Sequence, residues 1–373
     1  MAVYYHPSSM RRSSAAAGLL AAVLLVLPPR AARSAPPQAT SARTLKAARG
    51  EGKVVVYAAT DRTVAAPLLA DFEALHPSIS VEYHDLTSSE LHERFLREAA
   101  AGKVTVDVLW SPAMDLQIKL ANDGFAAAYD SPEAKGLPPW AVWRSEAFGT
   151  TLEPFVFVHD VRTLPAAEAP RSHAELVRAL EAQPARFRGR IATYDPERSG
   201  LGYLLLTQDG RIDPGFADTL RAYGRAEARL HSMTSAMIDD VRAGRALLAF
   251  NVLGSYALQE ERGSPSLAVV FPRDYVLAMS RIALITRDAP HPAAARVFLD
   301  YLISARGQAA LARRCSLFSI RSDVEGEFTA GALSRELGAR LKPIHIGPAL
   351  LVFLDPSKRD DVLRRWRAAF SRH

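Results

Sequence analysis

Cysteine is nearly absent from the sequence, and its body has no long apolar run. Cys315 is the single cysteine among 373 residues. An internal disulfide is therefore excluded, and the residue is interpreted as a small buried apolar side chain. No stretch of about 20 apolar residues follows the N-terminal segment, so the body should not span a membrane. The length is sufficient for two domains of ordinary size.

Motifs of catalysis, metal binding and nucleic-acid recognition are also missing. No Gly-x-Ser-x-Gly elbow of a serine hydrolase occurs. The stretch HERFL begins like a zinc-protease helix, but Leu96 stands where the second histidine is required. The ten histidines lack metal-ligand spacing, and the basic residues are scattered. We therefore expect neither an enzyme nor a metal or other cofactor, and no nucleic-acid partner.

Acidic residues are absent from residues 1–34, which differ from the rest of the chain. Arg11 and Arg12 precede an apolar run that ends at Leu27, and small residues follow. This order is typical of a secretory signal peptide, so we expect cleavage after about residue 34 and a periplasmic mature protein. An uncleaved anchor is the alternative, although the run is short for a membrane span. Removal of the four arginines in this segment lowers the net charge from +6 to +2.

The body alternates strand-like and helix-like patterns. Residues 53–59, KVVVYAA, form a continuous β-rich run, typical of a strand that is buried on both faces. Pro67 is placed in the first turn of the next helix, and Thr87–Glu90 is a capping box. Further strands are expected at 78–84, 104–110, 153–160, 189–195, 245–251 and 275–286, and helices at 113–122, 172–180, 214–230, 234–243, 292–303 and from 357 onwards. The alternation predicts open α/β sheets in two lobes, between which the chain passes more than once.

Four loops follow the predicted strands. Ligands of open α/β sheets bind beyond the carboxyl ends of strands. That rule selects residues 59–63, 110–113, 195–202 and 251–256, which hold small or polar side chains. We expect these loops to line one cleft.

The loop at 195–202 leads into a helix and carries Arg198, Ser199, Gly200 and Leu201. The first N–H groups of a helix lack partners and carry the positive end of its dipole. Ser199 adds a hydroxyl, and Gly200 lets a ligand approach without meeting a Cβ atom. The pattern predicts a site for phosphate, phosphonate or carboxylate, with Arg198 as a further contact or a solvent-exposed residue. The alternative is that Ser199 only caps the helix.

The other three loops supply hydroxyl, amide, phenol and carboxylate groups. Such groups orient a polar solute through several hydrogen bonds. The alternative is an ordinary strand-to-helix turn, in which Thr60, Asp61 and Ser255 act as helix caps. The candidate ligand-binding residues in these loops are Thr60, Asp61, Ser111, Asn251, Ser255 and Tyr256.

Four motifs in a fixed order give a resemblance to a known family. They are VVVYAATD with LLADFEALHPSISVEY, then VDVLWSPAMD, then the Ser199-Gly200 turn, then RAGRALLAFNVLGSY. Their order resembles the periplasmic substrate-binding proteins of ABC importers, family 1 of the extracellular solute-binding proteins. The nearest branch holds ferric-ion-binding, phosphonate-binding and phosphoglycerate-regulatory proteins. The resemblance covers about residues 46–370.

The resemblance implies a two-lobed periplasmic-binding-protein fold of type II, an α/β fold with mixed open sheets flanked by helices and a strand hinge. We expect one lobe from residues 46–160 and 275–325, and the other from 161–274 and 326–373. It further implies a monomer that closes on a solute and delivers it to an ABC permease in the inner membrane. A sensor that presents its ligand to a receptor kinase is the alternative.

Ferric members of the family imply a set of iron ligands that this chain lacks. The histidine position falls at Asp61, the glutamate position at Pro112, and the tyrosine pair at Leu253-Gly254, with Tyr256 displaced by two residues. Fe(III) prefers anionic oxygen donors, and proline, leucine and glycine side chains offer none. We therefore expect a small organic anion as the solute rather than iron.

Overall fold

The structure is a computed structural model that describes residues 40–371. The predicted signal peptide, residues 1–34, lies outside the described residues. Within the described range, no helix combines the length and the apolar character that crossing a membrane requires.

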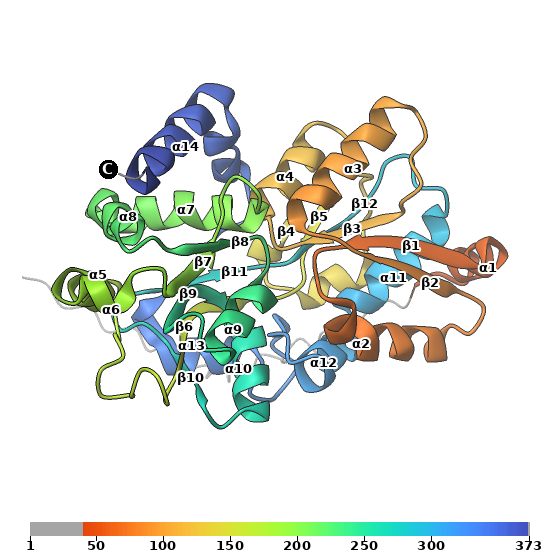
Figure 1. The fold of residues 1–373 in the computed structure, drawn as a ribbon. Coiled ribbons are helices and arrows are strands. Elements are labelled where there is room, and N and C mark those ends of the chain that lie inside the picture. Colours follow the sequence, from red (N-terminus) through yellow and green to blue (C-terminus); the bar gives the residue numbers. More distant parts are fainter. Residues whose placement is uncertain (1–39, 372–373) are drawn as a thin grey trace, which may run out of the picture. The chain divides into compact units, whose positions relative to one another are not determined.

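A first mixed sheet is built around the β-rich run at residue 53 (Figure 1). Strand β1 is parallel to β2 and β3, whereas β12 is antiparallel to β3 and β5. The carboxyl ends of β1 and β3 therefore meet at one edge of the sheet. The spatial order is β2 (Ser80–Asp85), β1 (Lys53–Ala58), β3 (Val108–Ser111), β12 (Ile282–Ile285), β5 (Ala147–Gly149) and β4 (Val142–Trp143).

A second mixed sheet contains the strand that precedes the Ser199-Gly200 turn. Strand β7 is parallel to β8 and β9, and β6 is antiparallel to β9, β10 and β11. The ends of β7 and β9 therefore face the same edge. The spatial order is β13 (Leu341–Pro343), β11 (Val276–Met279), β6 (Glu153–Asp160), β9 (Leu248–Leu253), β7 (Ile191–Tyr194) and β8 (Arg229–His231), and β10 (Leu267–Val270) also pairs with β6.

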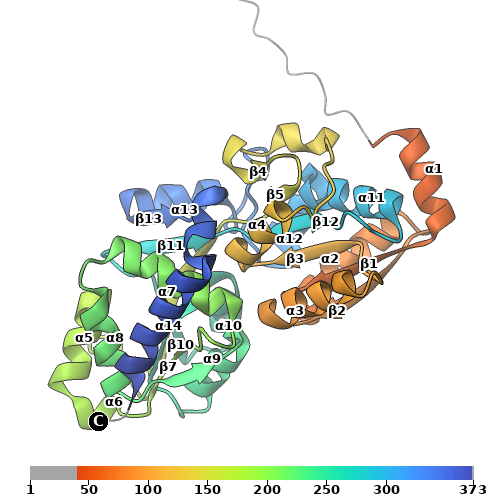
Figure 2. The ribbon, with the colours of Figure 1, turned by 90° about the horizontal axis from the view of Figure 1, so that it is seen from above.

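Helices flank both sheets (Figures 1 and 2). In the first group, Phe72 of α2 packs edge-on against Phe298 of α11 with the ring centroids 5.2 Å apart. In the second, α14 packs on α8. The helices are α1 (Ala42–Glu51), α2 (Arg62–Leu75), α3 (Ser88–Ala100), α4 (Met114–Asn122), α5 (His173–Ala182), α6 (Pro184–Phe187), α7 (Gly200–Ile212), α8 (Phe216–Arg225), α9 (Thr234–Arg242), α10 (Gly254–Gly263), α11 (Pro292–Ile303), α12 (Ala305–Arg314), α13 (Ala330–Leu337) and α14 (Pro356–Phe370), with short 3-10 helices η1 (Pro132–Gly136), η2 (Pro139–Ala141), η3 (Gly338–Arg340) and η4 (Pro348–Leu354).

Two chain segments cross between the sheets side by side. Residues 150–152 join β5 to β6, and residues 280–281 join β11 to β12. The N–H of Thr150 donates to the carbonyl of Arg281 at 2.9 Å, and the N–H of Arg281 donates to Thr151 Oγ1 at 2.9 Å. These bonds hold the two crossing segments together, as expected for a strand hinge.

The alternation of strands and helices is confirmed, and so is the capping box. Thr87 Oγ1 accepts from the N–H of Glu90, and the Glu90 carboxylate accepts from the N–H of Thr87. The carboxylate of Glu90 also lies in the first turn of α3, where the helix dipole favours it.

Several predicted bounds are wrong. Helix α2 begins at Arg62, so Pro67 lies inside the helix and not in its first turn. Residues 214–230 contain both a helix and strand β8, and residues 275–286 are divided between β11 and β12 of different sheets. In the two strand regions pairing with a distant strand decided the bounds, and local pattern does not reveal such pairing.

Strand β9 runs later than predicted, through residue 253. Asn251 is therefore a strand residue with a left-handed backbone, φ +58°. Leu253 takes the N-cap position of α10, so Ser255 lies within that helix and does not cap it. Asn is among the residues that tolerate this conformation best.

The residue ranges of the two predicted lobes stay a prediction. Strand pairing groups β6 and β11 with the second sheet. The predicted ranges 46–160 and 275–325 place both strands in the first lobe. Both strands continue directly into the crossing segments, where sequence pattern offers no signal of the change of sheet.

Candidate functional site

The start of α7 is organised by its own serine and glycines. Ser199 is the N-cap, and its Oγ accepts from the N–H of Gly202 at 3.1 Å. A Cβ atom on Gly202 would lie 2.6 Å from the Cβ of Tyr194, closer than packed carbon atoms allow. Glycine at this position lets α7 pack directly on the end of β7.

The same helix terminus faces α3 and α4, which belong to the first sheet's side. A Cβ atom on Gly200 would lie 2.8 Å from Leu116 Cδ1 and 3.3 Å from Ser88 Oγ. The N–H of Leu201 donates to Ser88 Oγ at 3.3 Å, a long hydrogen bond. Within residues 40–371 the N–H of Gly200 has no hydrogen-bond partner. One helix N-terminus thus offers an unpaired N–H and a weakly bonded one.

A small cavity of about 40 Å³ lies at this terminus. Its volume matches roughly one water molecule. Each of the four predicted loops contributes to its wall. The lining residues are Ala59, Asp61, Asp85, Leu86, Thr87, Ser88, Pro112, Tyr194, Ser199, Leu201, Ser232, Met233, Thr234, Leu253 and Tyr256.

Asp61 and Tyr256 join the two sides of this cavity. The Tyr256 hydroxyl donates to Asp61 Oδ1 at 2.9 Å and accepts from the N–H of Asp61 at 3.1 Å. Burial raises the pKa of the Tyr256 phenol, so it is protonated and acts as a donor. Asp61 is the N-cap of α2, but its side chain makes no capping hydrogen bond. Its carboxylate accepts the bond from Tyr256 instead.

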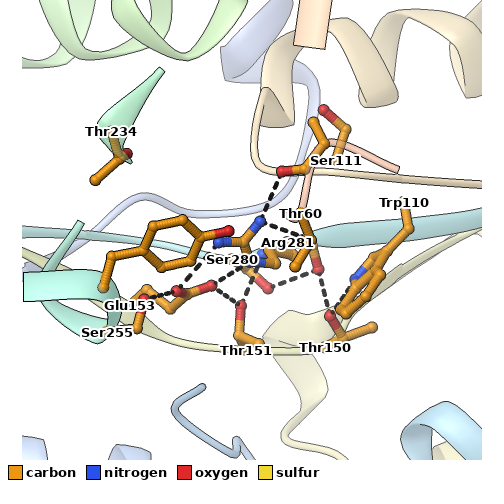
Figure 3. A network of polar contacts seen from close by, with 12 residues as sticks. Thr60, Trp110, Ser111, Thr150, Thr151, Glu153, Thr234, Ser255, Ser280 and Arg281 are labelled. Carbon is orange, nitrogen blue, oxygen red and sulfur yellow. Dashed lines mark hydrogen bonds and ion pairs between the residues drawn. The ribbon is translucent and has the colours of Figure 1, made fainter. Parts of the chain in front are cut away.

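Arg281 and Glu153 form a fully buried ion pair (Figure 3). Arg281 Nε donates to Glu153 Oε1 at 2.6 Å. Its Nη1 donates to Thr60 Oγ1 at 2.6 Å and to the Ala59 carbonyl at 2.9 Å. Burial opposes the charged form, but the nearby Glu153 carboxylate prevails and raises the pKa of Arg281.

Two predicted ligand residues, Thr60 and Ser255, belong to this network. Ser255 donates to Glu153, and Thr151 Oγ1 donates to the same carboxylate at 3.0 Å. Thr60 and Ser255 are both buried, at 0% and 1% exposure, and neither lines the cavity. In this structure they hold the Arg281–Glu153 pair that supports the site, and do not face a solute.

The remaining predicted residues lie around the cavity without lining it. Ser111 Oγ accepts from the N–H of Ala113 at 3.2 Å, directly before α4. Asn251 Nδ2 donates to the buried Asp209 at 2.7 Å, inside the second sheet's side. Arg198 is exposed to solvent. The structure thus brings together Asp61, Ser199, Leu201 and Tyr256 of the predicted set, with Gly200 beside them.

Sequence reasoning missed the residues that support the site. Arg281 is the one charge in the apolar stretch 275–286, and Glu153 is an acid that opens a β-rich run. An isolated charge in a buried strand requires a partner, and that signal could have identified both. Ser88 and Tyr194 carried no signal beyond the capping box and the strand end.

The two largest of the further cavities differ in their distance from this site. One of about 260 Å³ lies on the other side of Gly200 and is lined by Asp115, His92, Tyr203 and Arg359 among others. One of about 970 Å³ lies between α8 and α14, away from all four predicted loops. Among residues 40–371, no group of three or more His, Cys, Asp or Glu side chains is arranged to hold a metal ion.

Solved structures and one family model resemble this chain. A search of curated proteins gives no match. The substrate-binding protein of an ABC transporter from Agrobacterium tumefaciens is 37% identical, with a TM-score of 0.83 over 86% of this chain and 94% of that one.

Two more distant structures share the fold alone. AfuA from Actinobacillus pleuropneumoniae, with fructose 6-phosphate bound, is 16% identical, with a TM-score of 0.71 over 86% of this chain and 98% of that one. Iron-bound HitA from Pseudomonas aeruginosa is 17% identical, with a TM-score of 0.66 over 85% of this chain and 99% of that one. The predicted two-lobed type II fold with mixed sheets is therefore confirmed. The family described as "Bacterial extracellular solute-binding protein" matches residues 68–332, and the chain belongs to that family.

Proposed function

We propose that this protein captures a small organic anion in the periplasm and delivers it to an ABC importer. The family and the Agrobacterium substrate-binding protein support the transport role. The anion is a phosphonate, a phosphate ester or a carboxylate. The observation that carries this choice is the α7 N-terminus, where the N–H of Gly200 has no partner among the described residues.

The chemistry of the terminus favours a negative group. The helix dipole and the N–H groups of Gly200 and Leu201 attract an anion. In this structure the N–H of Leu201 donates a hydrogen bond to Ser88 Oγ at 3.3 Å, and the cavity has a volume of only about 40 Å³. An anionic group therefore displaces the Ser88 hydroxyl, and the two sides separate enough to admit it. Asp61 and Tyr256 then lie on the opposite wall.

Iron is the second candidate because iron-bound HitA shares the fold. Asp61 and Tyr256 place two oxygen atoms 2.9 Å apart at the cavity. However, Pro112 and Leu253 fill the neighbouring wall and offer no ligand atom. Burial also favours the neutral phenol of Tyr256, whereas iron binding requires its phenolate.

A thermal-shift screen of about a hundred organic anions, with neutral sugars and ferric citrate alongside, tests the proposal, because a ligand of the native state raises its melting temperature. We expect shifts with anions. If only neutral sugars or ferric ion shift the protein, the anion assignment is wrong. Selective interaction with a receptor kinase in place of a permease would establish the sensor alternative.

Gly200→Asp tests the seat of the anion. The new carboxylate repels the ligand and clashes with Leu116, so binding should weaken about ten- to a thousand-fold. Gly200→Ala introduces the clash without the charge. Ser199→Ala should weaken binding of the anion less than Gly200→Asp does, because the backbone N–H donors remain. Gly50→Asp is the matched control, since a Cβ there meets nothing within 4 Å. Unchanged affinity of Gly200→Asp for a genuine anionic ligand contradicts the proposal.

A further inference from the structure

The cavity of about 260 Å³ is bounded by elements from both sides of the molecule. Helices α3 and α4 contribute His92 and Asp115, and α7 and α14 contribute Tyr203 and Arg359. Its volume corresponds to roughly eight water molecules, so it has room for a chain of several carbon and oxygen atoms. We call it the Asp115 cavity.

Asp115 is a buried carboxylate with little to hold it. It is 3% exposed, and its Oδ1 accepts from the N–H of Leu116 at 2.9 Å. Apart from its own backbone N–H, no other group of residues 40–371 donates a hydrogen bond to this side chain. Burial raises the pKa of Asp115 to about 7, because the backbone hydrogen bonds and the charge of Arg359 offset only part of the loss of water. A buried acid in this state is suited to hydrogen bonds from a ligand.

His92 adds a second unpaired group on the same wall. Its Nδ1 is buried and has no hydrogen-bond partner among the described residues. Burial, and then the charge of Lys119, lower the pKa of His92 to about 4. The imidazole is therefore neutral at physiological pH, so each ring nitrogen either donates or accepts.

The rim of the cavity carries charges of both signs, since Glu93 and Glu197 line it together with two basic residues. The Arg359 guanidinium lies over the Tyr203 ring, 4.4 Å from its centroid, and Lys119 also lines the cavity. The Tyr203 hydroxyl is already used, since it donates to the Phe353 carbonyl at 2.6 Å. Hydroxyl groups carry no charge and both donate and accept hydrogen bonds, as Asp115 and His92 require.

Gly200 connects the cavity to the anion seat. It lines the Asp115 cavity, while its neighbours Ser199 and Leu201 line the small cavity on the other side. A ligand that rests its charge on the Gly200 and Leu201 N–H groups can therefore extend past Gly200 toward Asp115. The absence of a Cβ atom leaves that path open once Leu116 and Ser88 move apart.

We propose that the Asp115 cavity is the subsite for the hydroxyl-bearing end of the ligand, which makes the solute a polyhydroxylated organic anion. The inference rests on the proposed function for the position of the anion. Asp115 and His92 receive the hydroxyl groups, and the α7 N-terminus holds the charge.

Calorimetric titration with three probes tests the subsite. Fructose 6-phosphate carries both the anion and the hydroxyl groups, methyl phosphate carries the anion alone, and fructose carries the hydroxyl groups alone. Asp115→Leu should weaken binding of fructose 6-phosphate about 10- to 100-fold, the loss of one hydrogen bond to a charged group. Asp115→Asn should weaken it less, and methyl phosphate should bind all three proteins alike. Asp288→Leu, at an exposed acid, is the control.

The outcomes separate the subsite from the anion seat. Loss of fructose 6-phosphate binding in Gly200→Asp, with unchanged binding in both Asp115 variants, overturns the subsite and leaves the proposed function standing. If wild type binds fructose but neither phosphate, and Asp115→Leu abolishes the binding of fructose, the subsite is supported and the anion seat is wrong. If no probe distinguishes wild type from a folded Asp115 variant, the subsite is wrong.

Discussion

At the scale of single residues, the site depends on two glycines at the start of α7. Gly200 and Gly202 carry no Cβ atom, and each position has a neighbouring atom within 3 Å of where one would lie. One glycine lets α7 approach Leu116, and the other lets it approach Tyr194. The close packing of α7 and the exposure of its first N–H groups to a ligand are thus both results of these two glycines.

Asp115 makes the free energy of unfolding depend on pH. Its folded pKa of about 7 exceeds the ordinary value of 3.8, so the folded protein binds this proton more tightly than the unfolded chain. Stability from this group is complete below about pH 4 and is lost as the pH rises through about 7, up to about 4 kcal/mol in all. His92 stays neutral over most of this range, because its pKa is lowered to about 4. The other charged or titratable groups that line the cavity are Glu93, Lys119, Glu197, Tyr203 and Arg359.

Asp115→Asn should therefore remove most of the loss of stability between pH 4 and pH 8 that this carboxyl causes. Urea unfolding at several pH values measures it, and the variant should gain on wild type as the pH rises. Asp288→Asn changes an exposed carboxyl and should run parallel to wild type. Parallel curves for Asp115→Asn and wild type would show that the carboxyl titrates normally.

At the scale of elements, the two crossing segments depend on the Arg281–Glu153 pair. Arg281 precedes β12 of the first sheet and Glu153 opens β6 of the second, and both are fully buried. The guanidinium also reaches Thr60 and the Ala59 carbonyl at the end of β1. The pair therefore couples the crossing segments to the loop that carries Asp61.

Arg281→Met should destabilise the protein by about 3–5 kcal/mol, because it leaves Glu153 as an unpaired buried charge. The double variant Glu153→Met with Arg281→Met should recover part of that loss, since no charge remains buried. Urea unfolding of the single and double variants measures the coupling.

Arg242→Met is the control for the loss of exposed ion pairs, here with Asp239 and Glu260, each of which should cost at most about 1 kcal/mol. If Arg281→Met costs no more than this control, the buried pair contributes little to the connection between the sheets.

At the scale of the whole molecule, the family assignment leads to a prediction about processing. Residues 1–34 have the basic flank, the apolar core and the small residues of a signal peptide. We expect mature protein from the periplasm to begin near residue 35. N-terminal sequencing and intact mass measurement check this, and an intact Arg11–Leu27 segment in the membrane fraction would contradict it.

Local pattern was sufficient for much of the fold. The run KVVVYAA and the capping box at Thr87 each depend on neighbours within a few residues, and each forms as predicted. The serine at 199 caps α7, which is the alternative to its predicted role as a ligand contact. The order of motifs also indicated the family and the two-lobed fold. Since parallel strands present their carboxyl ends at one edge, even the four loops that line the small cavity were predictable.

Tertiary contacts decided what each predicted side chain does. Thr60 and Ser255 turned inward to the Arg281–Glu153 pair, and Asn251 to Asp209, because a buried charge or acid requires hydrogen-bond partners from distant strands. The division of residues 275–286 between two sheets has the same cause, since pairing partners lie more than a hundred residues away. The sequence alone thus determined the elements and the family. The packing of distant segments decided which polar groups remain free to bind a solute, because burial satisfies most of them first.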